Sequence, residues 1–126
     1  MHTCLTYFLV GTKQSTNFDA AAFCAALNIC TNDVEFRDNG GIRIGKNTNY
    51  NVDTNEMVYT TLASLWDKRT LLVELKNKYN LTYYLERVPQ IDVNSENPNP
   101  LLSLNADIIA FLHETGTIDD LDYYVF

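Results

Sequence analysis

The sequence contains little positive charge and few residues of the kinds that hold metals or covalent frameworks. Nine Lys and Arg residues stand against 16 Asp and Glu residues, so the formal net charge is −7. Nucleic acids and anionic membranes are held mainly by clusters of Lys and Arg, and this balance therefore predicts neither kind of partner. The two His and three Cys residues fit no zinc-binding spacing, and we expect no metal and no cofactor.

Long apolar runs are also missing. No segment approaches the roughly 20 apolar residues that a membrane-spanning helix needs. The apolar segment over residues 5–10 lacks a preceding basic region and a cleavage site, so it predicts a strand and not a signal peptide. Cys4, Cys24 and Cys30 are odd in number, and we expect reduced thiols in a cytoplasmic protein.

The chain does have the composition of one globular domain. Of its 126 residues, 46% are hydrophobic and 20% are charged. A chain of this length can bury a core without help from a disulfide or a metal. No internal repeat or linker divides it, so we expect a single domain over residues 1–126.

Helical patterns occupy three stretches. Asp19 is a good N-cap for a first short helix. Residues 57–79 have helical spacing with Asp67 as an internal cap, which predicts one bent helix or two abutting helices. A closing helix follows Asn105, the expected N-cap, and ends at Gly116, which suits a left-handed stop.

Strand patterns lie between the helices. We predict strands at residues 3–10 and 81–88, with an extension of the second strand at residues 91–93. Pro89 implies a sheet edge or a bulge at its position, because proline donates no backbone hydrogen bond. The Asn- and Thr-rich residues 46–55 predict a loop, with at most a brief strand at residues 50–52.

Residues 34–44 have the pattern of a β-hairpin. A two-residue Asn39-Gly40 turn would mix polar and apolar side chains on each face. A three-residue loop over residues 38–40 pairs Phe36 with Ile42 and places the apolar side chains on one face. We therefore expect the three-residue loop, with Gly40 left-handed.

This order of elements predicts an α+β fold. The few strands are not separated by crossover helices of uniform length, and a hairpin lies among them. We expect a mostly antiparallel sheet of four or five strands, with two or three helices packed on one face.

The segment after Gly116 carries the one local cluster of ionisable side chains. Strand alternation places Asp120, Asp122 and Tyr124 on one side, with Asp119 at the strand entrance. We predict these four residues, together with the aromatic Tyr84, as an interaction site. The sequence leaves open whether the acidic face binds a partner or is a solvated face that discourages edge pairing.

Several segments together resemble a known family. They are Phe18-Asp19 before a short helix that ends at Leu27 and Ile29, a Leu-rich long helix, Leu102-Ser103-Leu104 before the last helix, and the terminal Asp120-Leu121-Asp122-Tyr123-Tyr124. Over residues 4–126 the chain is similar to the bacterial domain-of-unknown-function 4279 family. The resemblance implies a small α+β domain with no established activity.

Three functions follow as hypotheses. The first is a cytoplasmic protein-binding domain without catalytic activity, for example an immunity or inhibitor protein that neutralises a basic toxin, as a monomer or weak homodimer. The second is a metal-dependent hydrolase that uses Asp119, Asp120 and Asp122. The third is a homo-oligomeric structural module that pairs through its final strand.

Overall fold

A computed structural model describes residues 3–12, 18–50, 53–91 and 102–125 of the chain. The elements in chain order are β1 (Thr3–Thr12), α1 (Ala20–Ala26), the 3-10 turn η1 (Thr31–Asp33), β2 (Val34–Phe36), β3 (Ile42–Tyr50), α2 (Thr54–Leu62), α3 (Arg69–Tyr79), β4 (Leu81–Ile91), α4 (Ala106–Thr115), β5 (Thr117–Leu121) and β6 (Tyr124–Val125). The predicted extension at residues 91–93 lies outside the described residues beyond Ile91, and so does the end of the brief strand predicted at residues 50–52.

The strands form one mixed sheet in the order β2-β3-β1-β4-β5, with β6 also paired to β4. The pairs among β1, β2, β3 and β4 are antiparallel, whereas β5 and β6 run parallel to β4. Arg87 of β4 pairs with Leu121 of β5, and Gln90 pairs with Tyr124 of β6. The register offset is the same in both pairs, so β6 continues β5 along the edge of the sheet.

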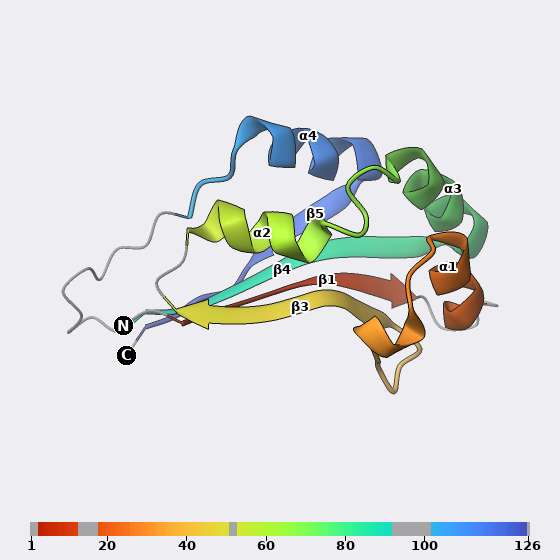
Figure 1. Cartoon of the computed structure of the whole chain (residues 1–126), viewed down its shortest axis with the longest axis horizontal. Coiled ribbons are helices and arrows are strands. Elements are labelled where there is room, and N and C mark those ends of the chain that lie inside the picture. The colour runs from red at the N-terminus through yellow and green to blue at the C-terminus, as the bar shows by residue number, and fades with distance from the viewer. Residues whose placement is uncertain (1–2, 13–17, 51–52, 92–101, 126) are drawn as a thin grey trace.

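The four α-helices lie on one side of the sheet (Figure 1). Alternate strand residues on this side are almost fully buried: Phe8 and Val10 of β1, Ile42 and Ile44 of β3, Tyr83 and Leu85 of β4. They pack with Phe23, Leu62, Leu72 and Phe111 from α1, α2, α3 and α4 in one hydrophobic core. The predicted α+β class, with a mostly antiparallel sheet and helices on one face, is confirmed; the described residues form six strands and four α-helices, one more of each than the largest number predicted.

The other side of the sheet carries none of the four α-helices, and we call it the open face. Strand alternation places on it Leu5, Tyr7 and Leu9 of β1 and Tyr84, Glu86 and Val88 of β4. Leu5, Leu9, Tyr84 and Val88 are partly exposed. Tyr7 is only 8% exposed because the guanidinium of Arg43 lies 4.6 Å from its ring centroid.

The predicted hairpin loop is confirmed. β2 and β3 pair with Phe36 opposite Ile42 and Val34 opposite Ile44. Gly40 has a φ of +88°, the left-handed conformation that the three-residue loop requires.

The loop predicted over residues 46–55 is wrong. β3 continues to Tyr50, paired with the first half of β1, and α2 begins at Thr54. The side-chain amide of Asn47 donates to the carbonyl of Met57 at 3.1 Å and to the hydroxyl of Thr61 at 3.0 Å. Asn47 thus lies in a strand because its side chain bonds to residues of α2. Local strand propensity, which disfavours Asn, does not predict this.

Pro89 lies neither at the sheet edge nor at a bulge, so that prediction is wrong. β4 pairs with β1 on one side and with β5 and β6 on the other, and Pro89 lies opposite Cys4. The β5 and β6 ladders are interrupted between Leu121 and Tyr124. The proline without an N–H therefore falls where the parallel ladder is already open.

The helix boundaries follow the predicted signals in part. Residues 57–79 divide into α2 and α3, as one of the two predicted arrangements has it, but Lys68 and not Asp67 is at the N-cap of α3. Asp19 caps α1 by accepting from the amide of Ala22 at 3.0 Å, as predicted. Asn105 occupies the N-cap of α4 without the expected cap bond, and its side-chain amide donates to the hydroxyl of Tyr59 at 3.1 Å.

Gly45 tests the close approach between β3 and α2. A Cβ atom at Gly45 would lie 2.2 Å from the carbonyl oxygen of Thr61, and the φ of +66° is strained for any L side chain. Gly45→Ala should lower the free energy of unfolding by about 2 kcal/mol or more. The matched control is Gly11→Ala, whose Cβ would meet its nearest neighbour at 3.6 Å. Equal urea midpoints for the two variants would contradict this account.

Candidate functional site

β4 and β5 bring three carboxylates together on the open face. Glu86 of β4 is paired with Asp120 of β5 in the parallel ladder, so their side chains are neighbours. Asp122 and Tyr124 follow Asp120 at alternate positions, and the hydroxyl of Tyr124 donates to Asp122 at 3.4 Å. We call Glu86, Asp120 and Asp122 the carboxylate cluster.

The predicted residues Tyr84 and Tyr124 lie beside this cluster. Tyr84 precedes Glu86 on the same face of β4 and is flanked by Leu9 of β1 and Ile118 of β5. Ile118 and Tyr124 are 50% and 55% exposed. The structure therefore brings together four of the five predicted site residues and surrounds them with exposed apolar surface.

The pKa of Glu86 is raised to about 7, chiefly by burial and also by a hydrogen bond with Asp120 and the charges of Asp120 and Asp122. The charge of Arg37 acts in the opposite direction. In the described part of the chain, none of the three carboxylates of the cluster forms an ion pair. Near neutral pH, both protonation states of Glu86 are therefore populated. The protonated form donates a hydrogen bond to Asp120, and the ionised form is repelled by Asp120 and Asp122.

Asp119, the fifth predicted residue, does not lie with the others. It faces the helices and binds the guanidinium of Arg87, with Nε to Oδ1 at 2.8 Å and Nη2 to Oδ2 at 2.6 Å. Arg87 is 4% exposed and also donates to the carbonyl of Leu102 at 2.6 Å. Asp119 is therefore the counter-charge of a buried arginine that ties β5 to β4, and it is not free to bind a ligand with Asp120.

Glu86, Arg43 and Lys46 belong to the open face but were not among the predicted site residues. Arg43 and Lys46 of β3 both reach Glu35 of β2, at 2.9 and 3.3 Å. Alternation along residues 81–88 already places Glu86 with Tyr84, so that signal was present. The neighbour of Glu86 on the next strand depends on the order of strands, which no local pattern records.

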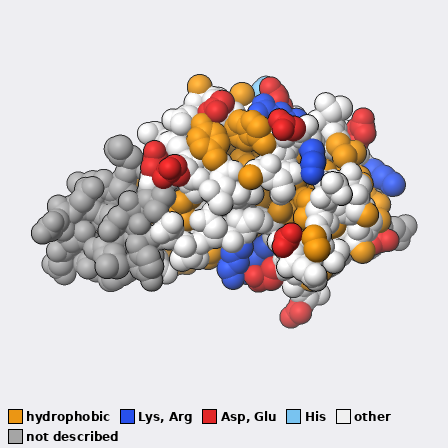
Figure 2. Space-filling view, in the orientation of Figure 1, with side chains coloured by type: hydrophobic (Ala, Val, Ile, Leu, Met, Phe, Trp, Pro, Cys, Tyr) orange, Lys and Arg blue, Asp and Glu red, His pale blue; other side chains and the backbone are white. Residues whose placement is uncertain are grey.

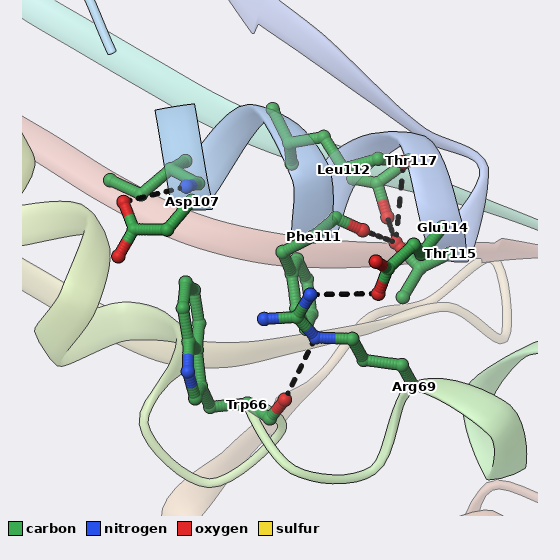
Figure 3. A network of polar contacts seen from close by, with 9 residues as sticks. Trp66, Arg69, Asp107, Phe111, Leu112, Glu114, Thr115 and Thr117 are labelled. Carbon is green, nitrogen blue, oxygen red and sulfur yellow. Dashed lines mark hydrogen bonds and ion pairs between the residues drawn. The ribbon is translucent and has the colours of Figure 1, made fainter. Parts of the chain in front are cut away.

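A second polar cluster, on the helix side, has its charges matched internally. The rings of Trp66 and Phe111 stack with centroids 5.4 Å apart, and the guanidinium of Arg69 lies over both rings (Figure 3). Arg69 pairs with Glu114 at 2.7 Å. Hydrophobic side chains gather here between α2 and α4, with acidic and basic groups around them (Figure 2). An open hollow of about 580 Å³ adjoins this cluster. The ion pair between Arg69 and Glu114 links the start of α3 to the end of α4.

The other candidates for chemistry have simple environments. Cys24 is fully buried, and burial raises the pKa of its thiol, which disfavours a nucleophilic thiolate. Among residues 3–12, 18–50, 53–91 and 102–125, no three His, Cys, Asp or Glu side chains are placed to hold a metal ion. None of the helices in these ranges is both long and apolar enough to cross a membrane.

Asp119 and Asp120 offer a matched pair of substitutions on opposite faces of one strand. Asp119→Asn should lower the free energy of unfolding by about 2 kcal/mol or more, because it leaves the buried Arg87 without a counter-charge. Asp120→Asn should leave the stability unchanged or raise it slightly, because it relieves repulsion with Glu86. Urea unfolding of both variants measures the difference, and equal stabilities of the two variants would contradict the role assigned to Asp119 as the counter-charge of Arg87.

Glu86 should make stability depend on pH. The folded state keeps its proton up to about pH 7, whereas an unfolded glutamate releases it near 4.5. Between these pH values the folded state therefore binds more protons than the unfolded state. The contribution of Glu86 to the free energy of unfolding is lost as pH rises through about 7. Glu86→Gln should flatten this dependence between about pH 5 and about pH 8.

The control is Glu74→Gln, which removes an exposed carboxylate from α3. Urea unfolding across the pH range compares the two variants with the parent chain. If the two variants have the same pH profile, the protonation assigned to Glu86 is wrong.

The comparison with protein families identifies what this chain is related to. A family model described as a domain of unknown function (DUF4279) matches residues 28–126. No curated protein and no solved structure matches the chain. The matched region runs through β2 to β6 and so includes the carboxylate cluster and the Arg87–Asp119 pair. Because the match spans well over half of the sequence, the chain belongs to the domain-of-unknown-function DUF4279 family.

Proposed function

We propose that this chain is a protein-binding domain without catalytic activity, and that it binds its partner through the open face. The observation that carries the proposal is the carboxylate cluster. Glu86 and Asp120 are neighbours in the ladder, Asp122 follows Asp120 at the next alternate position, and none of the three forms an ion pair within the residues that the structure describes. A cationic side chain of a partner would relieve the repulsion among them, so the site is suited to lysine or arginine.

The surroundings of the cluster suit a protein interface. Tyr84, Ile118 and Tyr124 provide aromatic and apolar contact area next to the charges. Tyrosine is among the residues that contribute most to binding energy when an interface excludes water around it. The attraction between opposite charges beside such residues becomes stronger on binding, because the local dielectric constant falls when water leaves.

An immunity or inhibitor protein is the concrete form of this proposal. Such a protein, acting in the cytoplasm, would cover the basic surface of a toxin and block it. The net charge of −7 would speed association with a basic partner through long-range attraction. Because the partner would be recognised by charge and aromatic contact, no reaction at the site is needed.

The two other hypotheses gain no support from the arrangement. A hydrolase using Asp119, Asp120 and Asp122 would need these carboxylates to converge, but Asp119 lies on the opposite face, bound to Arg87. Edge pairing of β5 with the β5 strand of another copy would place the aspartates of the two strands close together. Like charges across a strand pair are destabilising, so the edge disfavours that contact.

The test is capture of a basic partner that depends on the open face. The tagged chain, used as bait in an extract of its host, should retain a basic protein at low salt and lose it as salt screens the charges. Asp120→Lys should abolish the capture by reversing a charge in the cluster. Asp67→Lys, which changes the net charge equally at an exposed position on the helix side, should not.

Both variants need far-UV circular dichroism spectra that match the parent chain. Capture that survives Asp120→Lys, or that is lost equally with Asp67→Lys, would reject the open face as the binding surface.

A further inference from the structure

We infer that the open face binds a second copy of this chain, with the two sheets packed face to face about a two-fold axis parallel to β1. The inference rests on the proposed function, because it takes the open face as the binding surface, and it names a second copy of the chain as one protein that this face binds. The argument comes from the distribution of charge across that face.

The open face is acidic on one side of β1 and basic on the other. The carboxylate cluster lies on β4 and the edge strand β5. Across β1, Arg43 and Lys46 of β3 lie with Glu35 of β2 between them. Arg43 also covers the ring of Tyr7 on β1, which fixes this group of charges to the open face.

One row of residues across the sheet joins the two sides. Tyr7 of β1 pairs with Glu86 of β4, and Glu86 pairs with Asp120 of β5. On the other side of Tyr7, the register shift between β1 and β3 leaves Gly45 and Lys46 opposite it. The row therefore runs from Lys46 through Tyr7 and Glu86 to Asp120, with a base at one end and acids at the other.

A two-fold axis parallel to the strands and midway between β1 and β4 exchanges the two ends of this row. Lys46 of each copy then faces Asp120 of the other copy and Tyr7 faces Glu86, so the interface is isologous and the charges are complementary. A two-fold axis across the strands would instead place acid on acid. The charges thus select one of the two ways in which two copies of this face can meet.

The centre of the open face suits burial against another sheet. Leu5 and Leu9 flank Tyr7 on β1, and Tyr84 and Val88 flank Glu86 on β4. These four apolar side chains are partly exposed and lie close to the axis. An axis parallel to β1 keeps the strands of the two copies nearly aligned, which is the common arrangement of sheets packed about 10 Å apart.

Charge exchange between Lys46 and Asp120 tests the arrangement. In sedimentation over a dilution series, the parent chain should reach twice its mass of 14.4 kDa. Lys46→Glu and Asp120→Lys should each raise the dimer dissociation constant by roughly tenfold or more, because each places like charges together. The double variant has the net charge of the parent chain, and its dimer dissociation constant should lie within about threefold of the parent value.

Two control variants change the net charge away from the open face. Lys78→Glu on α3 matches Lys46→Glu, and Asp67→Lys matches Asp120→Lys. Neither should change the dissociation constant. A carbodiimide cross-link between Lys46 and Asp120 gives a second measurement. Within one chain these residues lie three strand spacings apart, roughly 14 Å, so a zero-length cross-link between them must join two copies.

The outcomes separate this inference from the proposed function. A chain that is monomeric throughout, a dimer that ignores both charge reversals, or a double variant that stays weak would each overturn the second copy as the occupant. If the monomer nevertheless captures a basic protein that Asp120→Lys releases, the proposed function stands with a different partner. If neither a dimer nor such a capture is found, both fail.

Discussion

The parallel pairing of β5 with β4 is the constraint on which the open face depends. It is secured by the two short hydrogen bonds between Arg87 and Asp119, formed on the helix side where Arg87 is nearly inaccessible to water. A buried guanidinium requires a matched carboxylate, so this pair fixes the position of β5 along β4. The same register places Asp120 beside Glu86 on the opposite face. One ion pair on the helix side, between buried Arg87 and partly exposed Asp119, thus sets the geometry of the carboxylates on the open face.

The two faces of the sheet treat their charges differently. On the helix side, Arg87 is matched by Asp119 and Arg69 by Glu114, and the aromatic rings are stacked against one another. On the β4 and β5 side of the open face, like charges are adjacent and partly exposed apolar side chains surround them. A folded protein gains nothing from such crowding by itself. The contrast supports the proposal of an interface on the open face, where a cation and apolar cover would come from another molecule.

This arrangement also links the two proposals. The acids that would recognise a basic protein include Asp120, which would meet Lys46 of a second copy. A basic partner would therefore compete with self-association, since one cluster cannot bind two cations of different molecules at the same place. Competition of this kind would tie the amount of free binding surface to the concentration of the chain.

The α+β class, the hairpin loop around Gly40, the Asp19 cap and the shared side of Asp120, Asp122 and Tyr124 can be predicted from the amino-acid order, because each depends on local backbone preference and strand alternation. The course of β3 beyond Gly45 cannot, since bonds from Asn47 to a distant helix hold that strand. The pairing of Asp119 with Arg87 and the place of Glu86 beside the acids emerge only when the strands assemble. Both facts follow from which strands are neighbours, and that choice is made by burial of the whole core and not by any segment alone.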